Sequence, residues 1–185
     1  MTDPSIYTIG HSNRSFRHFV ALLQAHAVGH LVDVRRHPGS RTFPHFNRHN
    51  LWASLARRGI DYTWMEELGG RRRNGPGGRS PHVALYSRGF RNYADHMSSE
   101  PFRRAVGELE DLARGGKSAL MCAERFFWKC HRRLLSDYLV ARGWCVLHIL
   151  GPGEVREHEL SAMARISDDG ELIYDVYSAD DGTDN

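Results

Sequence analysis

Lysine is nearly missing from this chain, since only Lys117 and Lys129 of its 25 basic residues are lysine. The positive charge is therefore carried by guanidinium groups, which bind phosphates through paired hydrogen bonds and stack on bases. Residues 1–150 hold 23 Lys and Arg against 12 Asp and Glu, whereas residues 151–185 hold 2 against 10. This basic body favours an anionic partner, nucleic acid or nucleotide, although a genome-wide preference for arginine would also explain the composition.

Cysteine and long apolar runs are scarce as well. The three cysteines, Cys122, Cys130 and Cys145, are an odd number in a chain without an export signal, so we expect thiols and no disulfide framework. No apolar run approaches the roughly 20 residues that cross a bilayer. The first residues lack the basic and apolar regions of a signal peptide, and we expect a cytoplasmic protein without a membrane partner.

Short apolar runs alternate with helical patterns along the chain. The apolar runs predict five strands, at about 6–10, 30–35, 60–64, 117–121 and 144–150. Strands separated by helices predict an α/β fold, a single domain with a mainly parallel, Rossmann-like sheet of about five strands and helices on both faces. We assign this α/β domain to residues 1–151. Residues 152–185 are expected to form an acidic extension with a short helix over 154–165, a hairpin remnant and a partly disordered end.

The strand ends carry an unusual number of polar side chains. Parallel strands deliver their last residues to one edge of the sheet, where open α/β sheets bind ligands. We therefore predict that one crevice gathers the residues His11, Ser12, Asp33, Arg35, Arg36, Glu66, Glu67, Cys122 and Glu124. Because a carboxylate is rarely buried in a strand without a partner, Asp33 is expected either to hold Arg35 or to take part in chemistry.

The segment from the fourth strand to the last helix, residues 118–133, allows three interpretations. Cys130, His131 and Arg132 at a helix start would form an anion site, with Glu124 beside it as a general base. Alternatively, Cys122 would be a thiolate nucleophile placed as in rhodaneses and cysteine phosphatases, although the loop here is longer and lacks glycine. Cys122, Cys130 and His131 would be the ligands of a zinc ion, but their spacing is not a strong zinc pattern. We expect no cofactor, with zinc as the alternative.

Arginines interleaved with aromatic residues mark the loops, and residues 69–79 combine four arginines with five glycines. Such pairs suit phosphate neutralisation and base stacking, but no specific DNA- or RNA-binding motif is present. The residues assigned to phosphate or nucleic-acid binding are Arg35, Arg36, Asn47, Arg71, Arg72, Arg73, Tyr93, Cys130, His131 and Arg132.

An ordered series of motifs resembles one known family. These are TIGHSN at 8–13, VDVRRHP at 32–38, FNR at 46–48, ELGGRRR at 67–73, GFRNYADHM at 89–97, and MCAE with CHRR within 121–133. Together they resemble the family named domain of unknown function 488, over about residues 6–150. The resemblance implies a compact α/β domain but no reaction. It points to His11, Asp33, Arg35, Glu67, Cys122, Glu124, Cys130, His131 and Arg132.

The expected function is that of a hydrolase acting on a nucleic acid or nucleotide-like phosphorylated substrate, at an N-glycosidic or phosphate-ester bond. Glu124 or Glu67 would activate water and His11 would act as a general acid or orienting group, so the catalytic candidates are His11, Asp33, Glu67, Cys122 and Glu124. One alternative is a thiol-dependent, sulfur-transfer enzyme using Cys122. The other is a non-catalytic nucleic-acid-binding module.

Overall fold

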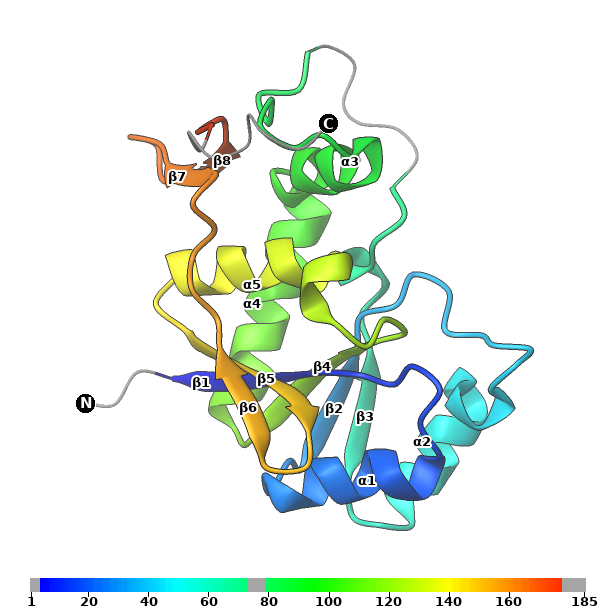
Figure 1. Ribbon diagram of the computed structural model, residues 1–185. Coiled ribbons are helices and arrows are strands. Elements are labelled where there is room, and N and C mark those ends of the chain that lie inside the picture. The colour runs from blue at the N-terminus through cyan, green and yellow to red at the C-terminus, as the bar shows by residue number, and fades with distance from the viewer. Residues whose placement is uncertain (1–3, 73–78, 178–185) are drawn as a thin grey trace.

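A six-stranded sheet forms the centre of the computed structural model, which describes residues 4–72 and 79–177 (Figure 1). The strand order is β3-β2-β4-β1-β5-β6, and all neighbours are parallel except β5 and β6. The strands are β1 Ser5–Gly10, β2 His30–Asp33, β3 Asp61–Trp64, β4 Ser118–Cys122, β5 Cys145–Gly151 and β6 Glu154–Glu157. The predicted α/β fold, a single domain with a mainly parallel sheet, is therefore confirmed, with one strand more than expected.

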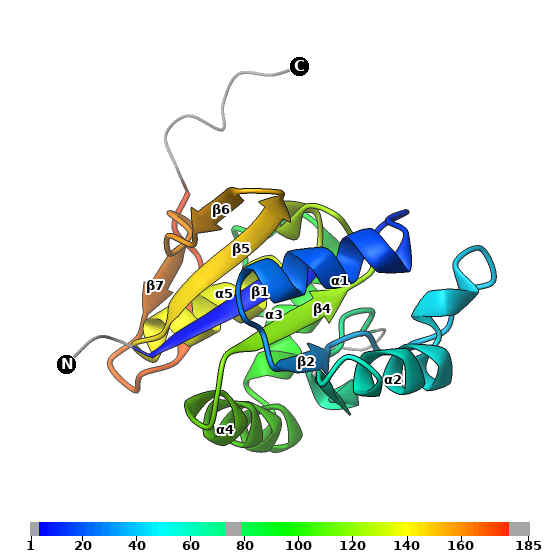
Figure 2. The ribbon, with the colours of Figure 1, turned by 90° about the horizontal axis from the view of Figure 1, so that it is seen from below.

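Helices cover both faces of the sheet, as predicted (Figures 1 and 2). One face carries α1 Phe16–Ala25 and α2 Arg48–Ala56, and the other carries α3 Arg88–Met97, α4 Glu100–Arg114 and α5 Arg132–Ala141. Because side chains alternate along a strand, Ala119 and Met121 of β4 enter the first core and Leu120 and Cys122 the second. Within residues 4–72 and 79–177, no helix is long and apolar enough to cross a bilayer.

Three short 3-10 helices interrupt the loops: η1 Pro44–Phe46, η2 Glu66–Leu68 and η3 Phe127–Lys129. The last of these shortens the predicted final helix, because Cys130 follows η3 in an extended conformation and α5 begins only at Arg132. Ser15 and Ser99 cap α1 and α4, because their side chains accept hydrogen bonds from backbone N–H groups of the first turn. Asn47 precedes α2 but accepts a hydrogen bond from the backbone N–H of Ser40 instead of capping the helix.

The helix predicted over residues 154–165 is wrong. Glu154–Glu157 forms β6, which pairs with β5 through a tight turn at Gly153, where φ is +68°. All four residues of β6 are exposed, so the strand is held by the backbone ladder and not by an apolar stripe. A hairpin is present, but it begins earlier than the predicted position at 168, as β7 Ala164–Ile166 and β8 Leu172–Tyr174. The predicted disordered end falls largely in residues 178–185, outside the described part of the chain.

Gly10 allows the end of β1 to contact the loop that follows β4. A Cβ atom at this position would overlap the backbone carbonyl oxygen of Glu124 and lie 2.8 Å from the Cα of Arg125. Backbone atoms cannot move away cheaply, so the close approach requires glycine. This contact fixes the floor of the sheet edge at which β1 and β4 end.

We therefore predict that Gly10→Ala lowers the free energy of unfolding by about 2–4 kcal/mol, because it forces two backbone segments apart. The matched control is Gly107→Ala in α4, where a Cβ would meet nothing within 4 Å. That change should instead raise the free energy of unfolding by up to about 1 kcal/mol, because alanine favours a helix more than glycine does. Urea unfolding of the two variants checks both signs, and equal effects would contradict the close-contact explanation.

Candidate functional site

A pocket of about 940 Å³ opens at the carboxyl ends of β1, β2 and β4. Its position is that expected for a ligand site in an open α/β sheet. The structure brings together six of the nine residues predicted to share one crevice, namely His11, Ser12, Arg35, Arg36, Cys122 and Glu124. The other three, Asp33, Glu66 and Glu67, do not line it.

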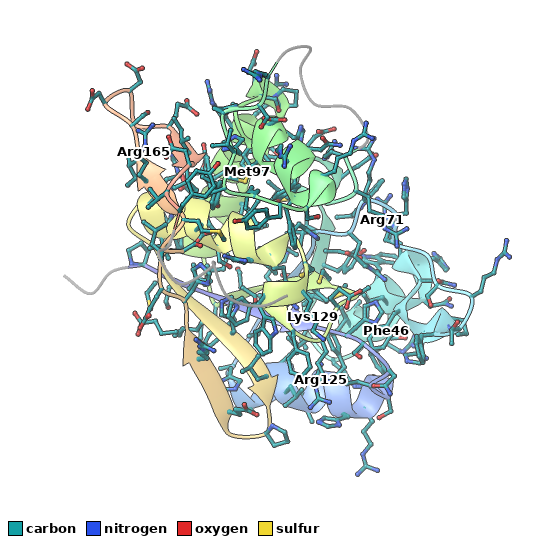
Figure 3. All side chains as sticks on the ribbon, turned by 45° about the horizontal axis from the view of Figure 1, so that its top comes forward. Phe46, Arg71, Met97, Arg125, Lys129 and Arg165 are labelled. Carbon is teal, nitrogen blue, oxygen red and sulfur yellow. The ribbon has the colours of Figure 1, made fainter. Side chains whose placement is uncertain are left out.

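The pocket wall is strongly cationic. Four cations from three segments line it, Arg35, Arg36, Arg71 and Lys129, while Glu124 is the one carboxylate among the described lining residues. Arg71, labelled in Figure 3, lies in the loop that follows η2, and Lys129, also labelled there, is the last residue of η3. Neither Arg36 nor Glu124 makes a side-chain hydrogen bond or ion pair within the described residues. Both are therefore available to a ligand.

Arg35 is held rigidly by groups behind the pocket. Its Nε lies 2.8 Å from Asp33 Oδ1, and its Nη2 donates to Asp33 Oδ2 and to the carbonyl oxygen of Phe46. Asp33 is fully buried and also accepts from the hydroxyl of Tyr62 at 2.7 Å. Asp33 thus has the structural role that the sequence offered as one of two possibilities. It orients Arg35, which lines the pocket.

His11 supports the same guanidinium. Its Nδ1–H donates to the carbonyl oxygen of Ser12 at 2.9 Å, its Nε2 lies 3.3 Å from Arg35 Nη1, and its ring stacks on Phe46. Burial lowers the pKa of His11 to about 4, so the ring is neutral at pH 7. With both nitrogens engaged, His11 orients Arg35 and has no proton poised for donation to a substrate.

Two thiols form the floor of the pocket. Cys122 Sγ and Cys130 Sγ are 3.4 Å apart, and Arg132 Nε lies 3.0 Å from the first and 3.4 Å from the second. Burial raises the pKa of Cys122, whereas the hydrogen bond from Cys122 lowers the pKa of Cys130 to about 6. Of the two thiols, Cys130 is therefore the one that ionises more easily.

Arg132 lies beneath the pocket and does not line it, so the anion site predicted at this residue is not formed by its side chain. Its guanidinium donates to Thr8 Oγ1 at 3.1 Å and to the carbonyl oxygens of Glu124 at 2.6 Å and Arg125 at 3.2 Å. The residue is 1% exposed. It holds the floor of the pocket together from inside.

His131 lines the pocket beside the thiols but is turned away from them. Its Nε2–H donates to the carbonyl oxygen of Val34 at 2.9 Å, and its ring packs edge-on against Tyr93. Burial lowers its pKa to about 4. Among the described residues, no group of three or more His, Cys, Asp or Glu side chains is arranged to hold a metal ion, and this includes the three proposed zinc ligands Cys122, Cys130 and His131.

The remaining predicted residues hold the loops around the pocket. Arg72 donates to the carbonyl oxygens of Glu66, Glu67 and Gly69, and its Nη1 lies 3.3 Å from the Glu67 carboxylate. Tyr93 lines the pocket with its ring, while its hydroxyl donates to the carbonyl oxygen of Leu68. Arg73 lies outside the described residues.

Two buried polar features were missed by the sequence analysis. Arg14 donates to the carbonyl oxygens of Gly10 and Leu150, so it joins the ends of β1 and β5, and nothing in its sequence context marks it. A chain of hydrogen bonds also runs inward from Arg132, through Thr8, His148 and His158 to Asp137. Here a signal existed, because a histidine inside the apolar run 144–150 requires a buried partner.

Comparisons with known proteins gave one family. The model described as "Domain of unknown function DUF488" matches residues 15–139, which include every pocket-lining segment except the turn after β1. No curated protein matches the chain. No solved structure matches it either.

The buried neutral state of His11 predicts an acid-sensitive fold. An unfolded histidine takes up its proton near pH 6.5, but folded His11 resists protonation until about pH 4. Between these two values the unfolded state binds a proton that the folded state does not. The free energy of unfolding is therefore unaffected by His11 above about pH 6.5 and falls as the pH drops toward 4, by up to about 1.4 kcal/mol per pH unit. Urea unfolding at a series of pH values should show this decline.

The variant His11→Gln keeps an acceptor for Arg35 but cannot titrate, so its profile should be flatter than that of the wild type between pH 6.5 and 4. His18→Gln, at an exposed position on α1, is the matched control and should keep the wild-type slope. Identical slopes in the wild type and His11→Gln would contradict the assignment.

Proposed function

Because the chain belongs to the family of domain of unknown function DUF488, whose description assigns no activity, we propose a function from the pocket itself. We propose an enzyme that hydrolyses an N-glycosidic or phosphate-ester bond in a nucleotide-like phosphorylated substrate, either free or within a nucleic acid. The observation that carries the proposal is the pocket wall at the carboxyl edge of the sheet, whose described residues include four cations and a single carboxylate.

The charge and shape of the pocket support a phosphorylated ligand. Arg35 is preorganised by Asp33 and His11, so little side-chain entropy is lost when it binds an anion. Arg36 has no competing partner within the described residues, and Phe43 and Phe90 add flat apolar surface to the wall. A volume of about 940 Å³ admits a nucleotide together with part of an adjoining nucleotide of the same strand.

Glu124 is the group best placed to activate water. It is exposed, lines the pocket and has no cationic partner within the described residues. By contrast, Asp33 forms an ion pair with Arg35, and Glu67 lies beside Arg72 and His96. A carboxylate next to bound phosphate can remove a proton from water as the water attacks. Arg35 and Arg36 then hold the substrate and stabilise the charge that develops on it.

Binding is tested with adenosine 5′-monophosphate and with a short single-stranded oligodeoxynucleotide. We expect Arg36→Gln to weaken binding of both by about 10-fold or more, because it removes a charged hydrogen bond to phosphate. Arg17→Gln, an exposed change on α1 outside the pocket, is the control and should leave affinity nearly unchanged. Fluorescence anisotropy and calorimetry at several salt concentrations supply the readout. Affinity that does not fall with added salt would refute phosphate binding by this wall.

Catalysis is tested by Glu124→Gln. We expect hydrolysis of the nucleotide or oligonucleotide to fall by about 100-fold or more, while binding stays equal or becomes tighter because a negative charge leaves the pocket. Product release is followed by chromatography, which also identifies the bond that is cut. If Glu124→Gln binds like the wild type and neither protein shows turnover, the protein is a non-catalytic binding module instead.

A further inference from the structure

We propose that Cys130 and Cys122 form a redox-active dithiol, in which Cys130 is the attacking thiolate and Cys122 closes the disulfide. This activity is separate from the hydrolysis proposed above. It differs from the sulfur-transfer alternative in assigning the nucleophile to Cys130, not to Cys122.

The first argument is the charge of Arg132. This guanidinium is 1% exposed, and a buried cation is costly unless an opposite charge lies beside it. Its hydrogen-bond acceptors in the described chain are a threonine hydroxyl, two backbone carbonyl oxygens and the two sulfurs. Of these, only the cysteines can ionise to anions in the physiological range. A thiolate is therefore the counter-ion of Arg132.

The second argument identifies which sulfur carries the charge. Cys130 lies two residues before the start of α5, and its sulfur accepts from the backbone N–H and the side chain of Arg132 and lies 3.4 Å from the Cys122 sulfur. The N-terminus of a helix and a neighbouring guanidinium both stabilise a thiolate. Cys122 lies at the end of β4, and its sulfur is 3.4 Å from the Cys130 sulfur and 3.6 Å from the carbonyl oxygen of Glu124. The negative charge is therefore assigned to Cys130 and the remaining proton to Cys122.

The third argument is access together with spacing. Cys130 and Cys122 both line the pocket, so a small reagent can reach them although they are only 7% and 2% exposed, respectively. A disulfide needs the sulfurs about 2 Å apart, and the present separation of 3.4 Å requires a small movement of the loop 123–129. Cys145 is outside the pocket lining, at the start of β5, and takes no part.

The oxidant is of the hydroperoxide class. The Cys130 thiolate attacks the terminal oxygen, the O–O bond breaks, and the alkoxide or hydroxide leaves and takes a proton from water, which converts Cys130 to a sulfenic acid. The sulfur of Cys122 then attacks that of Cys130. The S–S bond forms, the S–O bond breaks, and the departing hydroxide leaves as water with the proton of Cys122. Two thiols and one hydroperoxide thus give a disulfide, an alcohol or water, and one further water.

The structure also accounts for reversal. Disulfide formation removes the anion that faces Arg132 and leaves that buried cation without a counter-charge. A dithiol–disulfide couple whose reduced form is stabilised in this way is readily reduced by an external thiol. The pair is suited to turnover and not to permanent cross-linking.

The test begins with the reduced full-length protein, treated with an equimolar amount of hydrogen peroxide at pH 7 and analysed by peptide mass spectrometry. We expect a Cys122–Cys130 disulfide that dithiothreitol reverses, with Cys145 left as a thiol. In Cys122→Ser, dimedone should trap a sulfenic acid on Cys130. In Cys130→Ser, Cys122 should stay unmodified, and Cys145→Ser should behave as the wild type.

Alkylation of the wild type by iodoacetamide needs no substitution and therefore remains informative if a variant fails to fold. The rate at Cys130 should reach half its maximum near pH 6, well below the value of about 8.5 for an ordinary cysteine. Faster labelling of Cys122 than of Cys130, the absence of the disulfide, or a metal ion retained by the pair in native mass spectrometry would each overturn the proposal. Nucleotide binding measured on the same sample shows whether the hydrolase proposal survives independently.

Discussion

The buried guanidinium of Arg132 is the constraint on which the site depends. It connects Thr8 of β1, the backbone of the loop after β4 and the sulfurs on both sides of that loop. A loop of this length has no secondary structure of its own except η3, so its shape comes from these contacts and from its close approach to Gly10. The positions of Glu124 and Lys129 at the pocket therefore follow from one side chain that never reaches the pocket.

The same guanidinium ties the pocket to the C-terminal extension. Thr8 passes the hydrogen-bond chain to His148 and His158, and Asp137 ends the chain while also accepting from the hydroxyl of Tyr174 in β8. Burial lowers the pKa of His148, which keeps that ring neutral and able to accept and donate at once. The acidic extension is thus part of the structural support of the site, although the family match ends at residue 139.

The fold class could be predicted because it depends on local patterns, namely the alternation of apolar runs with helical patterns, and on the handedness of crossovers. The order of the strands in the sheet was not predicted. The same reasoning placed the strand ends, and with them Arg35, Cys122 and Glu124, at one edge. It could not predict side-chain direction. Asp33 and Glu124 both follow or end a strand, yet one is buried behind Arg35 and the other faces the ligand space. The edge strand β6 escaped prediction because backbone pairing, not an apolar stripe, creates it.

Arg35 and Arg132 both carry a buried positive charge, but the groups that balance the two charges differ. The charge of Arg35 is balanced by a permanent carboxylate, so this cation keeps its orientation whatever happens in the pocket. The guanidinium of Arg132 faces two sulfurs, and under the dithiol proposal its counter-ion is a thiolate, an anion that oxidation or alkylation can remove. Because a phosphate in the pocket would lie near that thiolate, the two negative charges disfavour each other, and linkage makes the effect reciprocal. An occupied pocket therefore makes Cys130 harder to ionise, and a disulfide at the floor makes the pocket a better anion site.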